Sequence, residues 1–289
     1  MITLAERKER IMNGVFFIAA SMSIVSLVLI IVFMFTNGIP VMLEYGLDEF
    51  LFGTVWRPTA SEPRFGLLPM IMGSIYVTIG AGVVGVPVGI LTALFMAEYC
   101  PKWLYKYLKP AVSLMASIPS IVYGFFALQF LVPLVRDNIG GNGYSMLTAM
   151  LLLAVMILPT VIELSESALR AVPRTYYNGG VALGATHERT TFTVMVPAAK
   201  SGVLSSVVLG IGRAIGETMA VVLIAGNQPI MPDGLLTGLR TLTTNIVLEM
   251  SYASGDHRSA LIATGVVLFV FILIINTIFL IIKNREAAK

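Results

Sequence analysis

The sequence predicts an all-α integral membrane protein with about six transmembrane helices. Of its 289 residues, 57% are apolar and only 12% are charged, whereas soluble domains carry about 25% charged residues. The apolar residues gather in long stretches with few or no charges, and several reach the roughly 20 residues that cross a bilayer. A soluble fold of this length could not bury so much apolar surface, so the composition indicates lipid as the solvent.

Six apolar stretches divide the chain, and together they predict a single transmembrane domain over residues 1–289. The predicted spans are 13–36, 66–98, 110–135, 144–165, 198–229 and 259–282. A membrane β-barrel would need strands of about 10 residues with polar residues at alternate positions. The stretches here are longer and continuously apolar, which excludes that class.

Two of the stretches contain a proline that affects the predicted helix. The stretch 66–98 is too long for one straight span, and Pro87 predicts a bend or a break within it. Pro119 predicts a kink in 110–135. Trp56 lies near a predicted membrane interface, where tryptophan commonly anchors a helix end, and we expect that role for it.

The distribution of lysine and arginine predicts the orientation of the chain. If the N-terminus is cytoplasmic, most of the 19 lysines and arginines fall in cytoplasmic segments, as the positive-inside rule requires. An even number of spans then places the C-terminus in the cytoplasm as well. The segments 37–64, 136–143 and 231–258 lie outside, and 163–197 lies inside.

Several functional classes are excluded by what the sequence lacks. The charges form short clusters rather than a basic stripe, so no nucleic acid partner is expected. One cysteine and two histidines leave no metal site and no Ser-His-Asp or Cys-His set. No G-x-x-x-x-G-K-[ST] motif occurs. We therefore expect no catalysis and no cofactor in this chain, and any ATPase that drives transport must be another chain.

Two opposite charges within 198–229 are the strongest functional signal. An ionisable side chain at the middle of a bilayer costs about 2.5–3.5 kcal/mol, so Arg213 and Glu217 should not face lipid. In a continuous helix their spacing of four residues places them on one face, with Ser206 roughly in line. Arginine suits bidentate contact with an oxyanion, so we interpret this face as part of a solute path. A salt bridge that only joins helices is the alternative.

The segment between Pro173 and Pro197 is the second signal. Both prolines suit the start of a helix, and the residues between them are mildly amphipathic. Physical chemistry alone leaves two interpretations open here, a solvated loop along the membrane surface and a docking site for a partner.

The segment between Pro173 and Pro197 resembles a loop of a known protein family. The run Asn178-Gly-Gly-Val-Ala-Leu-Gly184-Ala, followed by Pro197-Ala198, resembles the EAA loop of ABC importer permeases, which forms a coupling helix that docks on the ATPase subunit. Asn178 stands at the usual glutamate position, and two glycines replace the two alanines, whereas Gly184 matches. The resemblance implies a coupling segment over about 174–193. The residues implied to couple to the ATPase subunit are Asn178, Gly180, Ala182, Gly184 and Ala185.

A second run of residues resembles one family more specifically than the first run does. Gly212-Arg-Ala-Ile-Gly-Glu-Thr-Met-Ala-Val221, followed by Ala225-Gly-Asn227, is similar to the signature of phosphate importer permeases. Of the two paired permease subunits it resembles the PstC type, because the sister subunit usually has Ala-Pro where this chain has Met219-Ala220. The resemblance extends over about 48–228.

The resemblance implies a subunit with the type I ABC importer permease fold, in the inner or plasma membrane of a prokaryotic cell, with phosphate as the solute. The implied partners are a sister permease that completes a heterodimer, two ATP-binding subunits that carry ATP and Mg, and an external phosphate-binding protein. The implied path residues are Arg213, Glu217, Thr218, Ser206 and Asn227.

These residues also suggest how the path would work. A guanidinium is a fixed positive charge that does not deprotonate, and Glu217 would weaken the site and pair with Arg213 when no anion is bound. As a hypothesis, Glu217 accepts the proton-bearing oxygen of phosphate, which sulfate lacks at neutral pH. Three alternatives stay open: an ABC permease for molybdate, phosphonate or amino acids, a secondary transporter that works alone, and a membrane sensor or scaffold.

Overall fold

The fold is described by a computed structural model, which covers residues 4–287. Within these residues, five helices are long and apolar enough to cross a membrane: Ile11–Glu44, Leu68–Tyr99, Ser120–Asn138, Met146–Ala171 and Gly255–Ile281. The pair His187–Ala198 and Lys200–Gly216, bent by 68°, makes a sixth crossing if it is counted as one broken span. The prediction of an all-α protein with about six spans is confirmed.

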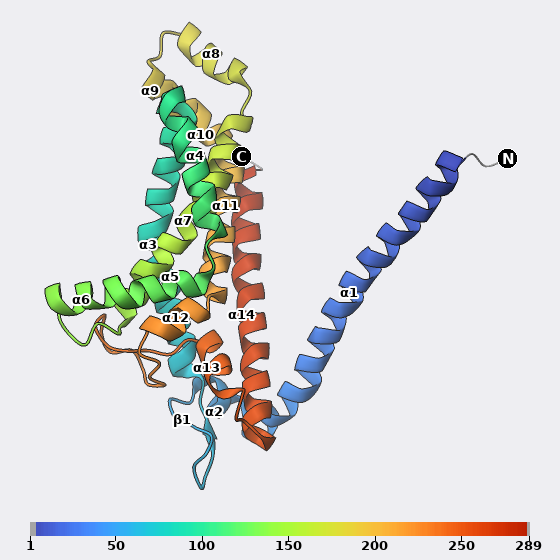
Figure 1. The fold of residues 1–289 in the computed structure, drawn as a ribbon, viewed down its shortest axis with the longest axis vertical. Coiled ribbons are helices and arrows are strands. Elements are labelled where there is room, and N and C mark those ends of the chain that lie inside the picture. The colour runs from blue at the N-terminus through green and yellow to red at the C-terminus, as the bar shows by residue number, and fades with distance from the viewer. Residues whose placement is uncertain (1–3, 288–289) are drawn as a thin grey trace.

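Three helices form the centre of the bundle (Figure 1): α3 (Leu68–Leu94), α7 (Met146–Ala171) and α11 (Lys200–Gly216). Glycines bring them close together. A Cβ at Gly85 would lie 2.7 Å from the carbonyl oxygen of Ala154, and one at Gly210 would lie 2.7 Å from Val161 Cγ2. Because small residues let helix backbones approach closely in membranes, these glycines allow α7 to pack tightly against both neighbours.

The first helix, α1 (Leu4–Glu44), diverges from the bundle (Figure 1). None of its most apolar 18-residue window is buried. It meets the rest of the chain near its C-terminal end, where it packs on α14 (Gly255–Ala287) and a Cβ at Gly38 would lie 2.9 Å from Ala263 Cα. Most of α1 is therefore left for lipid or another chain to cover.

The two prolines act differently. Pro87 lies inside α3, which continues through a π-helical turn, η1 (Phe95–Tyr99), so the stretch 66–98 contains no break at Pro87. At Pro119 the helix does end: α4 (Lys102–Ser117) stops before an extended Ile118, and α5 (Ser120–Phe126) begins after the proline. A residue before proline disfavours the α conformation. The structure therefore divides the predicted span 110–135 at Pro119, and the spanning helix runs over Ser120–Asn138 instead.

Short elements gather at the two ends of the bundle (Figure 1). One end carries α8 (Arg174–Ala182), α9 (His187–Thr190), the π-helical turn η3 (Thr191–Met195) and α10 (Val196–Ala198). We name it the coupling end, after the coupling segment predicted there. The opposite end, which we name the hairpin end, carries α2 (Leu47–Phe52), α13 (Leu242–Glu249) and the antiparallel strands β1 (Trp56–Arg57) and β2 (Arg64–Phe65). Between the ends, α5 continues through η2 (Ala127–Leu131) into α6 (Val132–Asn138), and α12 (Met219–Ile224) packs on α5.

The first turns of α1 and the last turns of α14 both point toward the coupling end (Figure 1). An even number of spans requires this arrangement. The cytoplasmic location of that end stays a prediction from the lysine and arginine distribution.

Candidate functional site

The predicted solute path contains a helix break. α11 ends at Gly216, because Glu217 adopts an extended conformation with φ −69° and ψ 130°. The chain turns at Thr218 and begins α12 at Met219. The predicted stretch 198–229 is therefore two helices with a break inside it. Broken helices that expose backbone groups are tolerated at membrane depth only where protein or a cavity surrounds them.

This break corrects the geometry that the spacing predicted for Arg213 and Glu217. One oxygen of Glu217, Oε1, accepts hydrogen bonds from the backbone N–H groups of Thr218 and Ala220, both at 3.1 Å. The carboxylate thus covers the start of α12. In the part of the chain that the structure describes, it makes no ion pair with Arg213, because the two residues no longer share one continuous helix face.

Arg213 is half-buried near the end of α11. Its Nη1 lies 3.4 Å from Thr160 Oγ1 on α7, a long hydrogen bond. Among the described side chains, no carboxylate forms an ion pair with its guanidinium. The positive charge in this half of the broken span is therefore not neutralised by any carboxylate among the described residues.

The other predicted path residues make local contacts. Ser206 is fully buried, and its Oγ lies 2.6 Å from Ser165 Oγ on α7. Thr218 donates its hydroxyl to Gly216 O. Asn227 has a positive φ of 54°, and its Oδ1 is buried without a partner among the described residues. The assignment of all three to the path stays a prediction.

The segment from the break to Asn227 is held at both ends by residues next to the start of α13. Thr243 donates its hydroxyl to the backbone oxygen of Glu217 at 3.0 Å. Arg240 donates from Nε to the backbone oxygen of Asn227 at 3.0 Å and from Nη1 to Asn245 Oδ1 at 3.0 Å. Neither Thr243 nor Arg240 was identified from the sequence.

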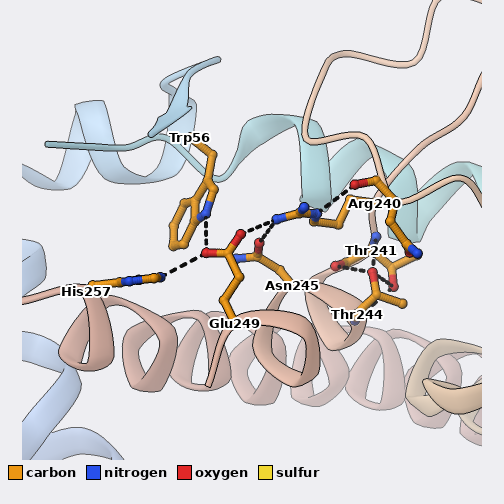
Figure 2. Close-up of polar contacts among 8 residues, drawn as sticks. Trp56, Arg240, Thr241, Thr244, Asn245, Glu249 and His257 are labelled. Carbon is orange, nitrogen blue, oxygen red and sulfur yellow. Dashed lines mark hydrogen bonds and ion pairs between the residues drawn. The ribbon is translucent and has the colours of Figure 1, made fainter. Parts of the chain in front are cut away.

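Arg240 is in turn fixed by Glu249, the last residue of α13 (Figure 2). Glu249 Oε1 accepts from Arg240 Nη1 at 2.5 Å, and Oε2 lies 2.9 Å from Trp56 Nε1 and 2.8 Å from His257 Nε2. Burial alone would raise the pKa of Glu249, but the hydrogen bonds from these three partners and the charge of Arg240 outweigh it. The pKa therefore lies below its ordinary value of 4.5. We name Glu249 and these three partners the Glu249 cluster.

The Glu249 cluster corrects the role expected for Trp56. The indole is 5% exposed and donates its N–H to a buried carboxylate, so it joins the hairpin to α13 and does not present its ring to lipid. The second tryptophan of the chain, Trp103 on α4, is 68% exposed.

The predicted coupling segment begins with an exposed helix and turn. α8 has no buried residue, and Leu183 directly after it is 91% exposed. Gly184 has φ +82°, which an L side chain rarely adopts. A Cβ at Gly180 would lie 2.7 Å from Thr190 Cγ2, so α8 approaches α9 closely there. Asn178, Ala182 and Ala185 lie in the same exposed helix and turn.

A second buried carboxylate lies where α7 approaches the coupling end. Glu166 is 1% exposed and accepts from Tyr105 Oη at 2.6 Å, Lys109 Nζ at 2.7 Å and Arg170 Nε at 2.6 Å. We name these four residues the Glu166 cluster. Nearby, Arg174 at the start of α8 pairs with Glu98 at 2.9 Å. In the described part of the chain, no group of three or more His, Cys, Asp or Glu side chains could hold a metal ion.

Comparison with known proteins decides the family. The family described as "Binding-protein-dependent transport system inner membrane component" matches residues 85–287. The chain belongs to this family. It is 39% identical over 266 residues to the probable ABC transporter permease protein YqgH of Bacillus subtilis, with 89% of this chain and 86% of that protein covered.

Other relatives of this permease are named as phosphate transport proteins. It is 33% identical over 261 residues to the phosphate transport system permease protein PstC of Haemophilus influenzae, covering 83% of this chain and 81% of that protein. It is 34% identical over 273 residues to the probable PstC of Methanocaldococcus jannaschii, covering 87% and 86%.

Solved structures establish the fold of the permease. The crystal structure of a bacterial ABC transporter for alginate import matches with a TM-score of 0.64 at 14% identity, covering 96% of this chain and 99% of that chain. The inward-facing methionine transporter MetNI matches with a TM-score of 0.62 at 18% identity, covering 76% and 95%. The chain is thus a multi-pass ABC importer permease subunit with the type I fold, a class that works with an ATPase and a substrate-binding protein.

Proposed function

We propose that this permease conducts inorganic phosphate, paired with a sister permease and coupled to two ATPase subunits and an external phosphate-binding protein. The observation that carries the proposal is the guanidinium of Arg213, which lies half-buried in a membrane-spanning helix without a carboxylate partner among the described side chains. A charge within the membrane raises the free energy of the protein unless a functional partner compensates it. An oxyanion on the path supplies one, and the PstC relatives support phosphate as that anion.

The arrangement of Glu217 supports a way to select phosphate. Its Oε1 is occupied by two backbone N–H groups, whereas no described residue donates a hydrogen bond to Oε2. A carboxylate oxygen is an acceptor only, so Oε2 suits the protonated oxygen of hydrogen phosphate and repels a fully deprotonated sulfate. Arg213 would bind the anion and Glu217 would keep the site weak enough for release.

The test is phosphate uptake by proteoliposomes that contain the complete importer and its external binding protein. Arg213→Met should lower uptake about 100-fold, which corresponds to about 3 kcal/mol of lost charge-assisted contact, and Arg213→Lys should retain part of it. Glu217→Gln should raise sulfate uptake relative to phosphate. An Arg213→Met variant that transports phosphate normally contradicts the proposal, and unchanged anion discrimination in Glu217→Gln contradicts the role of Glu217.

Coupling through α8 is tested by a pair of glycine substitutions. Gly184→Asp places a side chain and a charge at a positive φ beside the exposed Leu183, so we expect loss of uptake and of copurifying ATPase subunits without loss of membrane insertion. Gly179→Ala is the matched control, because a Cβ there meets nothing within 4 Å and its φ is not in the positive range. Normal uptake by Gly184→Asp removes the coupling role.

The same uptake assay separates the remaining alternatives. Molybdate, phosphonate or an amino acid as the preferred solute would identify an ABC permease with another cargo. The family membership itself argues against a secondary transporter that works alone and against a sensor or scaffold, because permeases of this family are importer subunits.

A further inference from the structure

The hairpin of β1 and β2 presents two arginines side by side. The strands pair in antiparallel register, with Trp56 opposite Phe65 and Arg57 opposite Arg64. Side chains alternate between the two faces of a strand. The aromatic pair faces inward, 5% and 2% exposed, and the arginine pair faces outward into solvent.

This arrangement is unfavourable for the hairpin itself. Like charges directly opposite each other across two strands are destabilising. Among the side chains that the structure describes, neither Arg57 nor Arg64 has an ion-pair partner, and Glu62 in the connecting turn pairs with neither. The contacts that hold the hairpin come from the inward aromatic pair and from backbone hydrogen bonds, and the outward arginines add no ion pair with any described residue.

The surface around the arginines has the shape of a receptor for a side chain. A hollow of about 380 Å³ is lined by both arginines together with Val55, Ala60, Ser61 and Glu62. Guanidinium groups bind carboxylates in a bidentate geometry. Two of them line one hollow that contains a single carboxylate, Glu62, so the hollow matches an acidic surface rather than an apolar one.

The inward face of the hairpin is fixed by ring contacts and by a hydrogen bond. Phe65 makes edge-to-face contacts with Tyr45 and Trp56, at centroid distances of 4.8 Å and 5.7 Å, and Trp56 donates to Glu249 (Figure 2). A preorganised pair of charges loses little entropy on binding a partner of fixed shape. This favours a folded protein over mobile lipid head groups.

We propose that the Arg57–Arg64 hairpin is the docking element for an acidic patch on the external solute-binding protein. The inference rests on the proposed function, which places the hairpin end outside the cell, opposite α8 (Figure 1). Its inner face reaches the path through hydrogen bonds, because Trp56 contacts Glu249, Glu249 holds Arg240, and Arg240 binds the backbone of Asn227. Docking at the hairpin thus acts on the segment that begins at the helix break.

The experiment measures affinity between the complete importer in nanodiscs and the phosphate-binding protein of the same system, over a range of salt concentrations. The double variant Arg57→Gln/Arg64→Gln should lower the affinity at least about tenfold at low salt and flatten its salt dependence. Arg57→Lys/Arg64→Lys keeps both charges and should retain most of the affinity. Arg136→Gln, which removes an exposed arginine of α6 that pairs with Asp137, is the control and should change nothing.

Stability provides an independent measurement. Because the two arginines repel each other, the glutamine pair should leave the unfolding temperature unchanged or raise it slightly. A clear fall would mean that the arginines stabilise the hairpin, which contradicts the proposal.

Three outcomes would contradict the proposal that the hairpin is a docking element. One is unchanged affinity of the glutamine pair at low salt. Another is a loss of affinity that occurs only in nanodiscs with anionic lipid, since the arginines would then bind head groups. The third is an equal loss in the Arg136→Gln control. Failure of the proposed function is recognised separately, because the unaltered importer would then not take up phosphate at all.

Discussion

The Glu249 and Glu166 clusters each stabilise a buried carboxylate, and they lie at opposite ends of the bundle. Each centres on a buried glutamate that accepts hydrogen bonds from three side chains. They differ in how exposed the side chains that contact each glutamate are. In the Glu249 cluster the side chains of Arg240 and His257 are 13% and 8% exposed, whereas Lys109 and Arg170 beside Glu166 are 37% and 42% exposed.

This difference indicates at which end of the bundle the charged pairs are harder to separate. A cation that reaches solvent can leave its partner at little cost, because water replaces the carboxylate. A buried cation cannot, because breaking its pair leaves an uncompensated charge. We therefore expect the hairpin end, which surrounds the helix break, to resist rearrangement more than the coupling end does.

The largest expected effect comes from removing each carboxylate in turn. Glu249→Gln leaves Arg240 buried without its counter-ion and should lower the free energy of unfolding by about 3–5 kcal/mol. Glu166→Gln should cost only about 1 kcal/mol, because Lys109 and Arg170 can turn to water. Scanning fluorimetry of the purified importer measures both. Equal losses of unfolding free energy in the two variants would contradict the difference between the two clusters.

Acidification should weaken the Glu249 cluster next, since it neutralises the same carboxylate without removing it. The native pKa of Glu249 is lowered, so its stabilisation is fully present above the ordinary value of 4.5 and is lost as the pH falls through the lowered native value. Unfolding temperatures recorded from pH 7 to pH 3 should fall more steeply for the unaltered chain than for Glu249→Gln. Parallel curves would show that Glu249 is not the titrating group.

A smaller effect is expected when one neutral donor is removed from each cluster. Trp56→Phe keeps the ring contacts but loses the N–H bond to Glu249, which should cost about 1.5–3 kcal/mol because the acceptor is charged and buried. Tyr105→Phe removes the corresponding donor from Glu166 and should cost less. Hydrogen exchange in the hairpin should rise in Trp56→Phe alone. A larger loss from Tyr105→Phe would reverse the assignment of the rigid end.

The smallest effect should come from the exposed coupling segment. The hydroxyl of Tyr177 in α8 lies 2.9 Å from His187 Nδ1 in α9. Tyr177→Phe should lower stability by no more than about 0.5–1.5 kcal/mol, because α8 has no buried residue. A loss as large as that of Trp56→Phe would mean that the coupling end is as locked as the hairpin end.

The sequence predicted the approximate number of spans because hydropathy is a local property and lipid accepts only long apolar helices. It predicted a kink at Pro119, where the structure has a complete break between α4 and α5. It did not predict that α3 passes Pro87 without a break, or that α11 ends at Gly216, because tertiary contacts decide both. At Glu217 the spacing from Arg213 is typical of a helix, but the backbone of Glu217 is extended and its carboxylate and carbonyl are bonded outside α11.

The Glu249 cluster lay beyond sequence reasoning for a different reason. Trp56 and Glu249 are 193 positions apart, and nothing in the neighbourhood of either residue points to the other. A weak signal existed, since Arg240 and Glu249 are two charges in a chain with only 12% charged residues. It showed that these charges needed partners, but not which ones.

The isolation of α1 has a consequence for biogenesis. Since none of its most apolar window is buried by the rest of the chain, this helix does not have to wait for later segments before it leaves the translocon. A charged residue introduced at its centre should therefore act during synthesis, as a failure of insertion. The same change in α7, where 56% of the apolar window is buried, should act after synthesis, as a failure of assembly.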